Sequence, residues 1–141
     1  MLRYMLDSDC CIRVIRERPA TARQRFREEF GRVAISTIVL TELLVGAAKS
    51  MRPEHNRDGI DQFVGRLAVL PFDASAAEHA ADIRAELERQ GRKIGPHDSL
   101  IAGHARSRGL IMVTGNIREF GRVAELDCEN WFPEHDGFHE V

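Results

Sequence analysis

Short apolar runs alternate with longer amphipathic stretches along most of this chain, and this alternation constrains the fold more than any other feature. The apolar runs cover residues 4–6, 33–35, 67–70 and 110–113, and they end at Asp7, Ser36, Pro71 and Thr114. Runs of this length that stop at polar or turn-forming residues predict buried strands. Helical patterns lie between them, at residues 9–17, 20–30, 37–50, 54–66, 74–90 and 97–108.

Residues typical of helix ends support these boundaries. Asp73 precedes a run of small residues as an N-cap, and Pro96 stands where a helix begins. Gly91 and Gly109 follow the ends of two predicted helices. The helix boundaries are therefore predicted by local chemistry as well as by hydrophobic pattern.

Strands that alternate with helices predict an α/β fold. We expect a three-layer sandwich with a mostly parallel central sheet flanked by helices. Ligands of such sheets bind at the carboxyl ends of the strands. This rule directs attention to Asp7 and to the turn at residues 114–116.

Length and composition predict one cytoplasmic domain. A chain of 141 residues with 43% hydrophobic and 30% charged residues is typical of a globular domain. The apolar runs are too short for a membrane span, and Asp7 interrupts the first run too early for a signal peptide. We expect a domain over residues 1–132 and a polar tail over residues 133–141.

The distribution of charge leaves two interpretations open. A net charge of −2 at first argues against a nucleic-acid ligand, because phosphate binding needs concentrated positive charge. Arginines nevertheless crowd one short stretch, at Arg13, Arg16, Arg18, Arg23, Arg25 and Arg27. Guanidinium groups bind phosphates through paired hydrogen bonds. The cluster is either a phosphate-binding surface or a solvated helical face.

Three acidic residues stand where a structural protein usually has other residue types. Asp7 follows the first predicted strand, and a role as helix N-cap is served as well or better by Ser8 or Asp9. Glu42 lies in a helix that is apolar on nearly all sides, so its carboxylate needs a cation or an ion pair with an arginine. Asp98 lies in the first turn of the last predicted helix, where the helix dipole also favours a negative charge.

Together these carboxylates predict a metal site. Converging carboxylates without a basic partner repel one another, and a hard divalent cation is the usual reason to hold them together. Mg²⁺, or Mn²⁺ as a substitute, suits ligands that are all oxygen and keeps water molecules, one of which can attack a phosphodiester. The pattern therefore predicts phosphodiester hydrolysis.

Four sequence blocks surround these carboxylates and the last predicted strand. They are residues 5–9 (MLDSD), 36–43 (STIVLTEL), 94–105 (IGPHDSLIAGHA) and 113–120 (VTGNIREF). In order and spacing they resemble the motifs of PIN-domain ribonuclease toxins of the VapC family, and the resemblance covers nearly the whole chain except the tail. It implies a PIN-like fold in which Asp7, Glu42 and Asp98 coordinate one or two Mg²⁺ ions, with a fourth position near the last strand.

The resemblance also implies a function and partners. VapC toxins belong to type II toxin-antitoxin systems and cleave RNA, commonly tRNA in the anticodon region. The block at residues 95–109 (GPHDSLIAGHARSRG) resembles especially the subgroup that attacks initiator tRNA. The resemblance further implies a homodimer, a VapB-type antitoxin that binds across the acidic groove, and contact with operator DNA only through that antitoxin.

The chain departs from many relatives near the implied site. Ser8 and Asp9 stand where Thr and Asn are common; Ser8 keeps the hydroxyl, and Asp9 either binds metal or raises the pKa of a neighbour. The fourth family position is often Asp, and here Asn116 or Glu119 must fill it. Asn116 supplies a neutral oxygen, whereas Glu119 restores the negative charge or begins a helix.

Two hydroxyl residues and a histidine lie beside the implied ligands. We expect Thr114 and Ser99 to hydrogen-bond to the carboxylates. His97 precedes Asp98 and is interpreted as exposed loop polarity rather than as a substrate contact.

Two other functions compete with the nuclease. Residues 6–9 after a strand also resemble the nucleophile motif of haloacid-dehalogenase-like phosphatases. That mechanism needs a lysine for the phosphate and a later acidic pair, yet the chain has only Lys49 and Lys93, lacks the pair, and leaves Glu42 without a role.

The other alternative is a protein- or RNA-binding module whose carboxylates only cap helices and pair with arginines. It predicts that metal changes neither stability nor activity.

Overall fold

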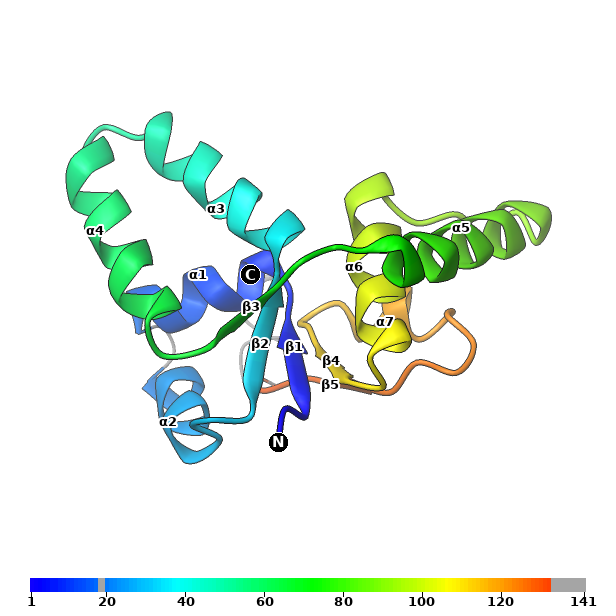
Figure 1. Ribbon diagram of the computed structural model, residues 1–141, viewed down its shortest axis with the longest axis horizontal. Coiled ribbons are helices and arrows are strands. Elements are labelled where there is room, and N and C mark those ends of the chain that lie inside the picture. Colours follow the sequence, from blue (N-terminus) through cyan, green and yellow to red (C-terminus); the bar gives the residue numbers. More distant parts are fainter. Residues whose placement is uncertain (18–19, 133–141) are drawn as a thin grey trace, which may run out of the picture.

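The computed structural model describes residues 1–17 and 20–132 (Figure 1). Within these ranges the strands are β1 (Tyr4–Leu6), β2 (Val33–Ser36), β3 (Ala68–Leu70), β4 (Ile111–Val113) and β5 (Cys128–Glu129). The helices are α1 (Ser8–Arg16), α2 (Ala20–Glu28), α3 (Thr37–Ala48), α4 (Pro53–Val64), α5 (Ala74–Arg89), α6 (Pro96–Ser107) and α7 (Ile117–Phe120). The predicted tail at residues 133–141 lies outside the described residues.

The predicted strands and helices are all present, and their ends differ from the prediction by a residue or two. Two short elements were not predicted. β5 contains only Cys128 and Glu129, and it is a strand because it pairs with β4. α7 is a single turn after β4. Elements this short carry too few residues for a periodic pattern.

The sheet is parallel throughout the described residues, with the strand order β3-β2-β1-β4-β5. In the centre, Tyr4 of β1 pairs with Val33 of β2 and with Ile111 of β4. All residues of β1 and β2 are buried, which explains why these strands appear in the sequence as uninterrupted apolar runs. The predicted α/β class with a mostly parallel sheet is confirmed.

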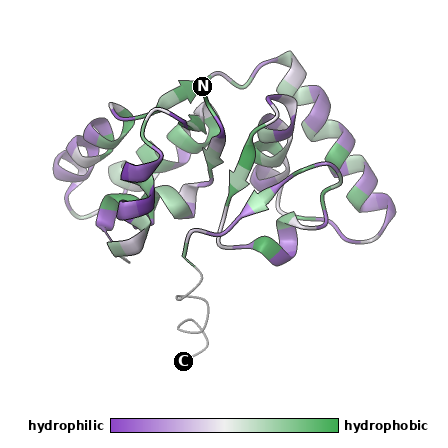
Figure 2. Ribbon diagram, turned by 90° about the horizontal axis from the view of Figure 1, so that it is seen from below, coloured by the Kyte–Doolittle hydropathy of each residue, from purple (hydrophilic) through white to green (hydrophobic). Residues whose placement is uncertain are grey.

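Helices cover the sheet on two sides, as predicted for a three-layer sandwich. Figures 1 and 2 place α1–α4 on one side of the strands and α5–α7 on the other. Figure 2 shows apolar residues concentrated in the strands, while the outer helices carry many of the hydrophilic ones. Met5, Leu6, Ile35 and Met112 are fully buried between the layers. None of the described helices is long and apolar enough to cross a membrane.

Local helix signals are also confirmed. The Asp73 carboxylate caps α5 by accepting a hydrogen bond from the backbone N–H of Ala76 at 2.9 Å. Pro96 is the first residue of α6. Gly91 and Gly109, just past α5 and α6, have φ values of 69° and 65°, a backbone conformation that favours glycine.

The strand order reverses between β1 and β4. From β1 the sheet extends through β2 and β3 on one side and through β4 and β5 on the other. The segments that leave the carboxyl ends of β1 and β4 therefore diverge, and ligands of open parallel sheets bind in such a crevice. Leu6 pairs with Val113, so the next residues, Asp7 and Thr114, stand side by side at its base.

Candidate active site

Asp7 stands at the carboxyl end of β1 and caps α1. Its backbone is extended, and its carboxylate accepts a hydrogen bond from the backbone N–H of Cys10 at 2.9 Å. The prediction that Ser8 or Asp9 serves better as the cap is wrong, because both lie inside the first helical turn and their side chains have other partners. Burial raises the pKa of the Asp7 carboxyl; hydrogen bonds from Thr114 and Cys10 oppose this rise, and the charge of Asp9 adds to it.

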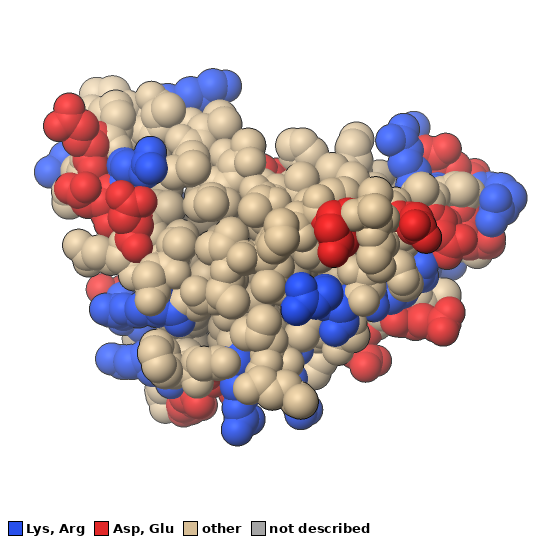
Figure 3. Space-filling view, viewed as in Figure 1, with Lys and Arg blue, Asp and Glu red and all other residues tan. Residues whose placement is uncertain are grey.

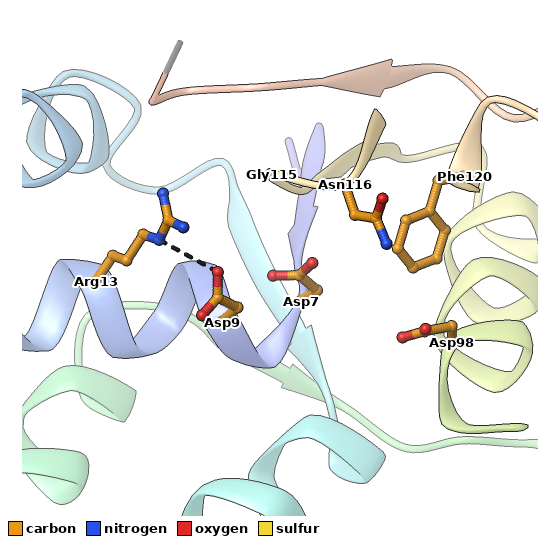
Figure 4. A pocket seen from close by; sticks show the side chains of 7 residues that line it. All are labelled: Asp7, Asp9, Arg13, Asp98, Gly115, Asn116 and Phe120. Atoms are coloured by element: carbon orange, nitrogen blue, oxygen red, sulfur yellow. Dashed lines mark ion pairs between the residues drawn. The ribbon is translucent and has the colours of Figure 1, made fainter. Parts of the chain in front are cut away.

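Asp98 lies in the first turn of α6, on the side of the crevice opposite α1 (Figure 4). Burial and the neighbouring carboxylate of Glu119 raise the pKa of Asp98 to about 6, and the charges of Asp7 and Glu42 add to the rise. Glu119 accepts a hydrogen bond from the Asn116 amide at 3.1 Å. Because its pKa is raised to about 6, the Asp98 carboxyl takes up a proton at a pH much closer to neutral than an ordinary aspartate does.

Glu42 projects from α3 toward α1 and α6. Its Oε1 accepts a hydrogen bond from the Ser8 hydroxyl, and its Oε2 lies 2.8 Å from Nδ1 of His97. The sequence left a cation or an arginine as the partner of Glu42. Among the described residues Glu42 contacts Ser8 and His97, so the ion pair with an arginine is not formed. The interpretation of His97 as loop polarity is also wrong: 64% of its side chain is exposed, but it belongs to α6 and contacts Glu42.

Asp9 forms an ion pair with Arg13, one turn further along α1, with 3.2 Å between the carboxylate and Nε (Figure 4). The side chain of Asp9 is 64% exposed, whereas that of Arg13 is only 18% exposed. The Arg13 guanidinium lies over the ring of Phe132, 5.2 Å from its centroid. Of the two roles predicted for Asp9, the geometry supports the rise that it causes in the pKa of Asp7.

The two hydroxyl residues beside the site make different contacts. Thr114 is fully buried, hydrogen-bonds to the Asp7 carboxyl and accepts a hydrogen bond from the Asn116 N–H at 3.0 Å. The Ser99 hydroxyl instead donates to the carbonyl oxygens of Gly95 and Pro96. Ser99 thus departs from the expected contact with a carboxylate, because a serine in the first helical turn reaches a carbonyl three or four residues earlier.

A cavity of about 340 Å³ opens at this edge of the sheet (Figure 4). Its lining residues are Asp7, Asp9, Arg13, Asp98, Gly115, Asn116 and Phe120. The fold thus brings together the predicted site residues after β1, on α6 and after β4. Glu119 joins them through its contacts with Asn116 and Asp98. Glu42 instead lines a neighbouring cavity between α1, α3 and α4.

Of two further residues that line the cavity, the sequence analysis named Arg13 only as part of the arginine cluster and did not single out Phe120. Arg13 stands four residues after Asp9, and this spacing of opposite charges on a predicted helix was a usable signal. Phe120 lies in the single-turn helix α7, where no periodic pattern marks it. Its burial at the site is a consequence of the fold.

Comparison with known proteins identifies the family. The PIN domain family model matches residues 4–126. A tRNA(fMet)-specific endonuclease VapC from Shigella flexneri is 54% identical to this chain, covering 93% of it and 99% of the relative. A protein of the same name from Salmonella typhimurium is 48% identical with the same coverage. The chain belongs to the PIN-domain VapC family.

A solved VapC structure has the same fold. DNA-bound VapBC from Salmonella typhimurium includes a chain that matches with a TM-score of 0.89 and 48% identity, covering 93% of this chain and 99% of that one. The family membership expected from the four sequence blocks is therefore confirmed. PIN-domain VapC nucleases generally depend on a divalent metal ion.

The donor atoms at this VapC site suit a hard cation. The described cavity lining supplies carboxylate and amide oxygens and no thiolate or imidazole. Within residues 1–17 and 20–132, no group of three His, Cys, Asp or Glu side chains is close enough to hold a metal ion. Mg²⁺ usually binds through one or two carboxylates and keeps water as its other ligands, so Asp7 and Asp98 fit this role.

Cations are sparse around the cavity of this VapC chain. Neither Lys49 nor Lys93 lines it, which leaves the phosphatase mechanism without its lysine. From the arginine cluster, Arg23 pairs with an acidic residue of its own region and Arg25 with Glu129. Figure 3 shows charged side chains of both signs toward the two ends of one face, over α4 and α5, and further Lys and Arg side chains along its lower edge.

Proposed function

We propose that this chain is the toxin of a VapBC-type toxin-antitoxin pair and a metal-dependent endoribonuclease that cleaves tRNA in the cytoplasm. We propose initiator tRNA, cut in the anticodon region, as the target. The observation that carries the proposal is the acidic cavity at the β1–β4 crevice, in a chain 54% identical to a tRNA(fMet)-specific endonuclease. The catalytic unit is one PIN domain over residues 1–132, followed by a polar tail.

In this proposal Asp7 and Asp98 hold Mg²⁺, for which Mn²⁺ can substitute. Such a cation supplies charge neutralisation at the phosphodiester and lowers the pKa of a water molecule. Glu42 contributes a further carboxylate once it leaves Ser8 or His97. Either Asn116 or Glu119, which contact each other, supplies the fourth position.

The surrounding residues prepare the carboxylates for this role. The Thr114 hydroxyl opposes the burial-driven rise in the pKa of Asp7 and so favours the ionised form that binds a cation. Burial and Glu119 raise the pKa of Asp98 to about 6, so that below this pH the free site holds a proton that a cation must displace. Metal binding is therefore linked to proton release at Asp98.

The partners follow from the same family. The solved relative from Salmonella typhimurium is a VapBC assembly bound to DNA. We infer that this chain binds a VapB-type antitoxin across its acidic cavity, forms a homodimer, and reaches operator DNA only through the antitoxin.

Cleavage of tRNA by the purified chain, free of antitoxin, tests the proposal. Initiator tRNA and elongator tRNA are incubated with Mg²⁺, Mn²⁺ or EDTA. Wild type is compared with Asp7→Asn, Asp98→Asn and Asp61→Asn, the last being an exposed carboxylate on α4 that pairs with Arg57. Asn is as good an N-cap as Asp, so Asp7→Asn removes the charge while keeping the start of α1.

We expect metal-dependent cleavage that prefers initiator tRNA, is lost in Asp7→Asn and Asp98→Asn, and persists in Asp61→Asn. Equal cleavage of both tRNA classes would remove the proposed target but keep the nuclease. Intact RNA with the wild-type chain and metal would exclude the nuclease and favour the binding-module alternative.

A further inference from the structure

Arg13 is the basic residue of the acidic cavity. Besides Arg13, the described residues that line it are three carboxylates and three neutral residues. Figure 4 shows Arg13 and Asp98 on opposite sides of Asp7, with Arg13 on α1. A polyanionic substrate that enters this cavity meets negative charge at the candidate metal ligands and, among the described lining residues, positive charge only at Arg13.

The Arg13 side chain is held in place before any substrate arrives. Its Nε bonds to Asp9 at 3.2 Å, and its guanidinium lies 5.2 Å from the centroid of the Phe132 ring. With 18% of the side chain exposed, the group is largely withdrawn from water. A guanidinium that is already ordered and partly desolvated loses less entropy when it binds an anion, and its interaction with that anion is less screened.

Arg13 also borders the turn that follows β4. A Cβ placed on Gly115 would lie 3.9 Å from Nη2 of Arg13, so this end of the guanidinium faces the turn that carries Asn116. The turn and α1 form two walls of the same cavity. An anion between these walls meets the Arg13 donors next to Asp7.

We propose that Arg13 binds a backbone phosphate of the RNA beside the Asp7–Asp98 site, and that Asp9 positions it. This inference rests on the proposed nuclease function and assigns the phosphate contact within it. Arg13 is thereby a substrate-binding residue, and Asp9 acts through Arg13. The pairing of Asp9 with Arg13 also keeps the Asp9 charge from adding fully to the repulsion of RNA.

A competing explanation is that Arg13 serves only as the counter-ion of Asp9. The two explanations differ in the double variant Asp9→Asn/Arg13→Gln. If Arg13 only neutralises Asp9, removing both charges restores the wild-type behaviour. If Arg13 binds phosphate, the double variant stays as defective as Arg13→Gln, because the phosphate contact is still missing.

The test combines kinetics and binding with initiator tRNA. KM and kcat for cleavage are measured for wild type, Arg13→Gln, Arg13→Lys, Asp9→Asn and the double variant. Binding is measured in the cleavage-deficient Asp98→Asn chain over a series of salt concentrations. Arg16→Gln is the matched control, because this substitution removes the same charge from α1. Arg16 lies three residues after Arg13 and lines the neighbouring cavity that Glu42 also lines.

We expect Arg13→Gln to raise KM and weaken binding about tenfold, the loss typical of a hydrogen bond between charged groups. The slope of log affinity against log salt should fall by about 0.7 to 0.9, corresponding to one phosphate contact. Arg13→Lys should recover part of the binding, since it keeps the charge without the guanidinium fork. Arg16→Gln should change KM less than about twofold.

Wild-type KM in a folded Arg13→Gln chain, or recovery in the double variant, would overturn this inference while leaving the nuclease intact. A wild-type chain that neither cuts nor binds tRNA would overturn the proposed function itself. Thermal unfolding of each variant checks that Arg13→Gln has not simply lost the Phe132 contact and with it the fold.

Discussion

Oε2 of Glu42 lies 2.8 Å from Nδ1 of His97, and this contact joins α3 to the first turn of α6. On its other oxygen Glu42 accepts a hydrogen bond from Ser8 of α1. Three helices thus meet at one carboxylate. Glu42 must give up one of these two contacts before it can turn to a cation in the neighbouring cavity.

His97→Ala tests this restraint. The substitution removes the His97 contact and frees Glu42. We expect the Mn²⁺ affinity of the chain to rise about threefold, which corresponds to the free energy of a weak, partly exposed hydrogen bond. His97→Asn is the control, because its amide can donate from a position close to Nδ1. Isothermal titration calorimetry measures the Mn²⁺ affinity of both variants and of the wild type. A lower affinity in His97→Ala would mean that His97 holds Glu42 in its binding position.

Thr114→Val removes the buried hydroxyl beside Asp7 with little change in shape. The pKa of Asp7, already raised by burial, should rise further because a hydrogen bond that opposes the rise is lost. We expect Mn²⁺ affinity to fall about threefold or more at low pH and to approach the wild-type value as the pH rises and protons cease to compete. Thr114→Ser keeps the hydroxyl, so equal losses in both variants would refute this role.

Asp98→Asn should stabilise the metal-free chain at neutral pH. The pKa of Asp98 is about 6 in the folded chain and lower when unfolded, so the folded chain binds the proton more tightly. The stability of the wild type therefore falls as the pH rises from the unfolded-state pKa of Asp98 to its folded-state pKa of about 6, and it is constant at higher pH. Because Asp98 is only half-buried, we expect Asp98→Asn to gain about 1 to 2 kcal/mol at pH 7.5 and almost nothing at pH 4.

Urea unfolding in EDTA at both pH values measures this difference. Asp61→Asn, on exposed α4, should follow the wild type at each pH. Saturating Mn²⁺ should reverse the order of Asp98→Asn and wild type at pH 7.5, since metal binding stabilises only the chain that keeps its ligand. A stability gain for Asp98→Asn that is the same at both pH values would contradict the raised pKa as its cause.

Gly103→Ala should destabilise the packing of α6 on α5. A Cβ at Gly103 would lie 2.4 Å from the backbone nitrogen of Ala80 and 2.7 Å from its Cβ, so one helix must move. We expect a loss of about 2 to 3 kcal/mol in the free energy of unfolding. Gly46→Ala on α3 meets no atom within 4 Å and should be neutral or stabilising by up to about 1 kcal/mol. Similar unfolding free energies for the two variants would exclude close packing as the cause.

Much of the fold was predictable because its signals are local. The apolar runs at β1 and β2 are buried on both faces, and Asp73 and Pro96 mark helix starts by their own backbone chemistry. β5 escaped prediction, since two residues become a strand only through pairing with β4. Asp7 was predicted as a candidate site residue from its place after β1, but its role as the cap of α1 was not predicted.

The α/β architecture, the candidate carboxylates and the family could be predicted from the amino-acid sequence, because strand burial, helix capping and motif spacing are properties of short segments. The contacts between distant side chains could not be predicted in this way: Glu42 meets Ser8 and His97, 34 and 55 residues away, and Asp98 meets Glu119. The physical reason is that such contacts depend on how helices from distant segments pack around the sheet, which no local pattern encodes. The raised pKa of Asp98 is a product of that packing, since burial and neighbouring charge arise only when the chain is folded.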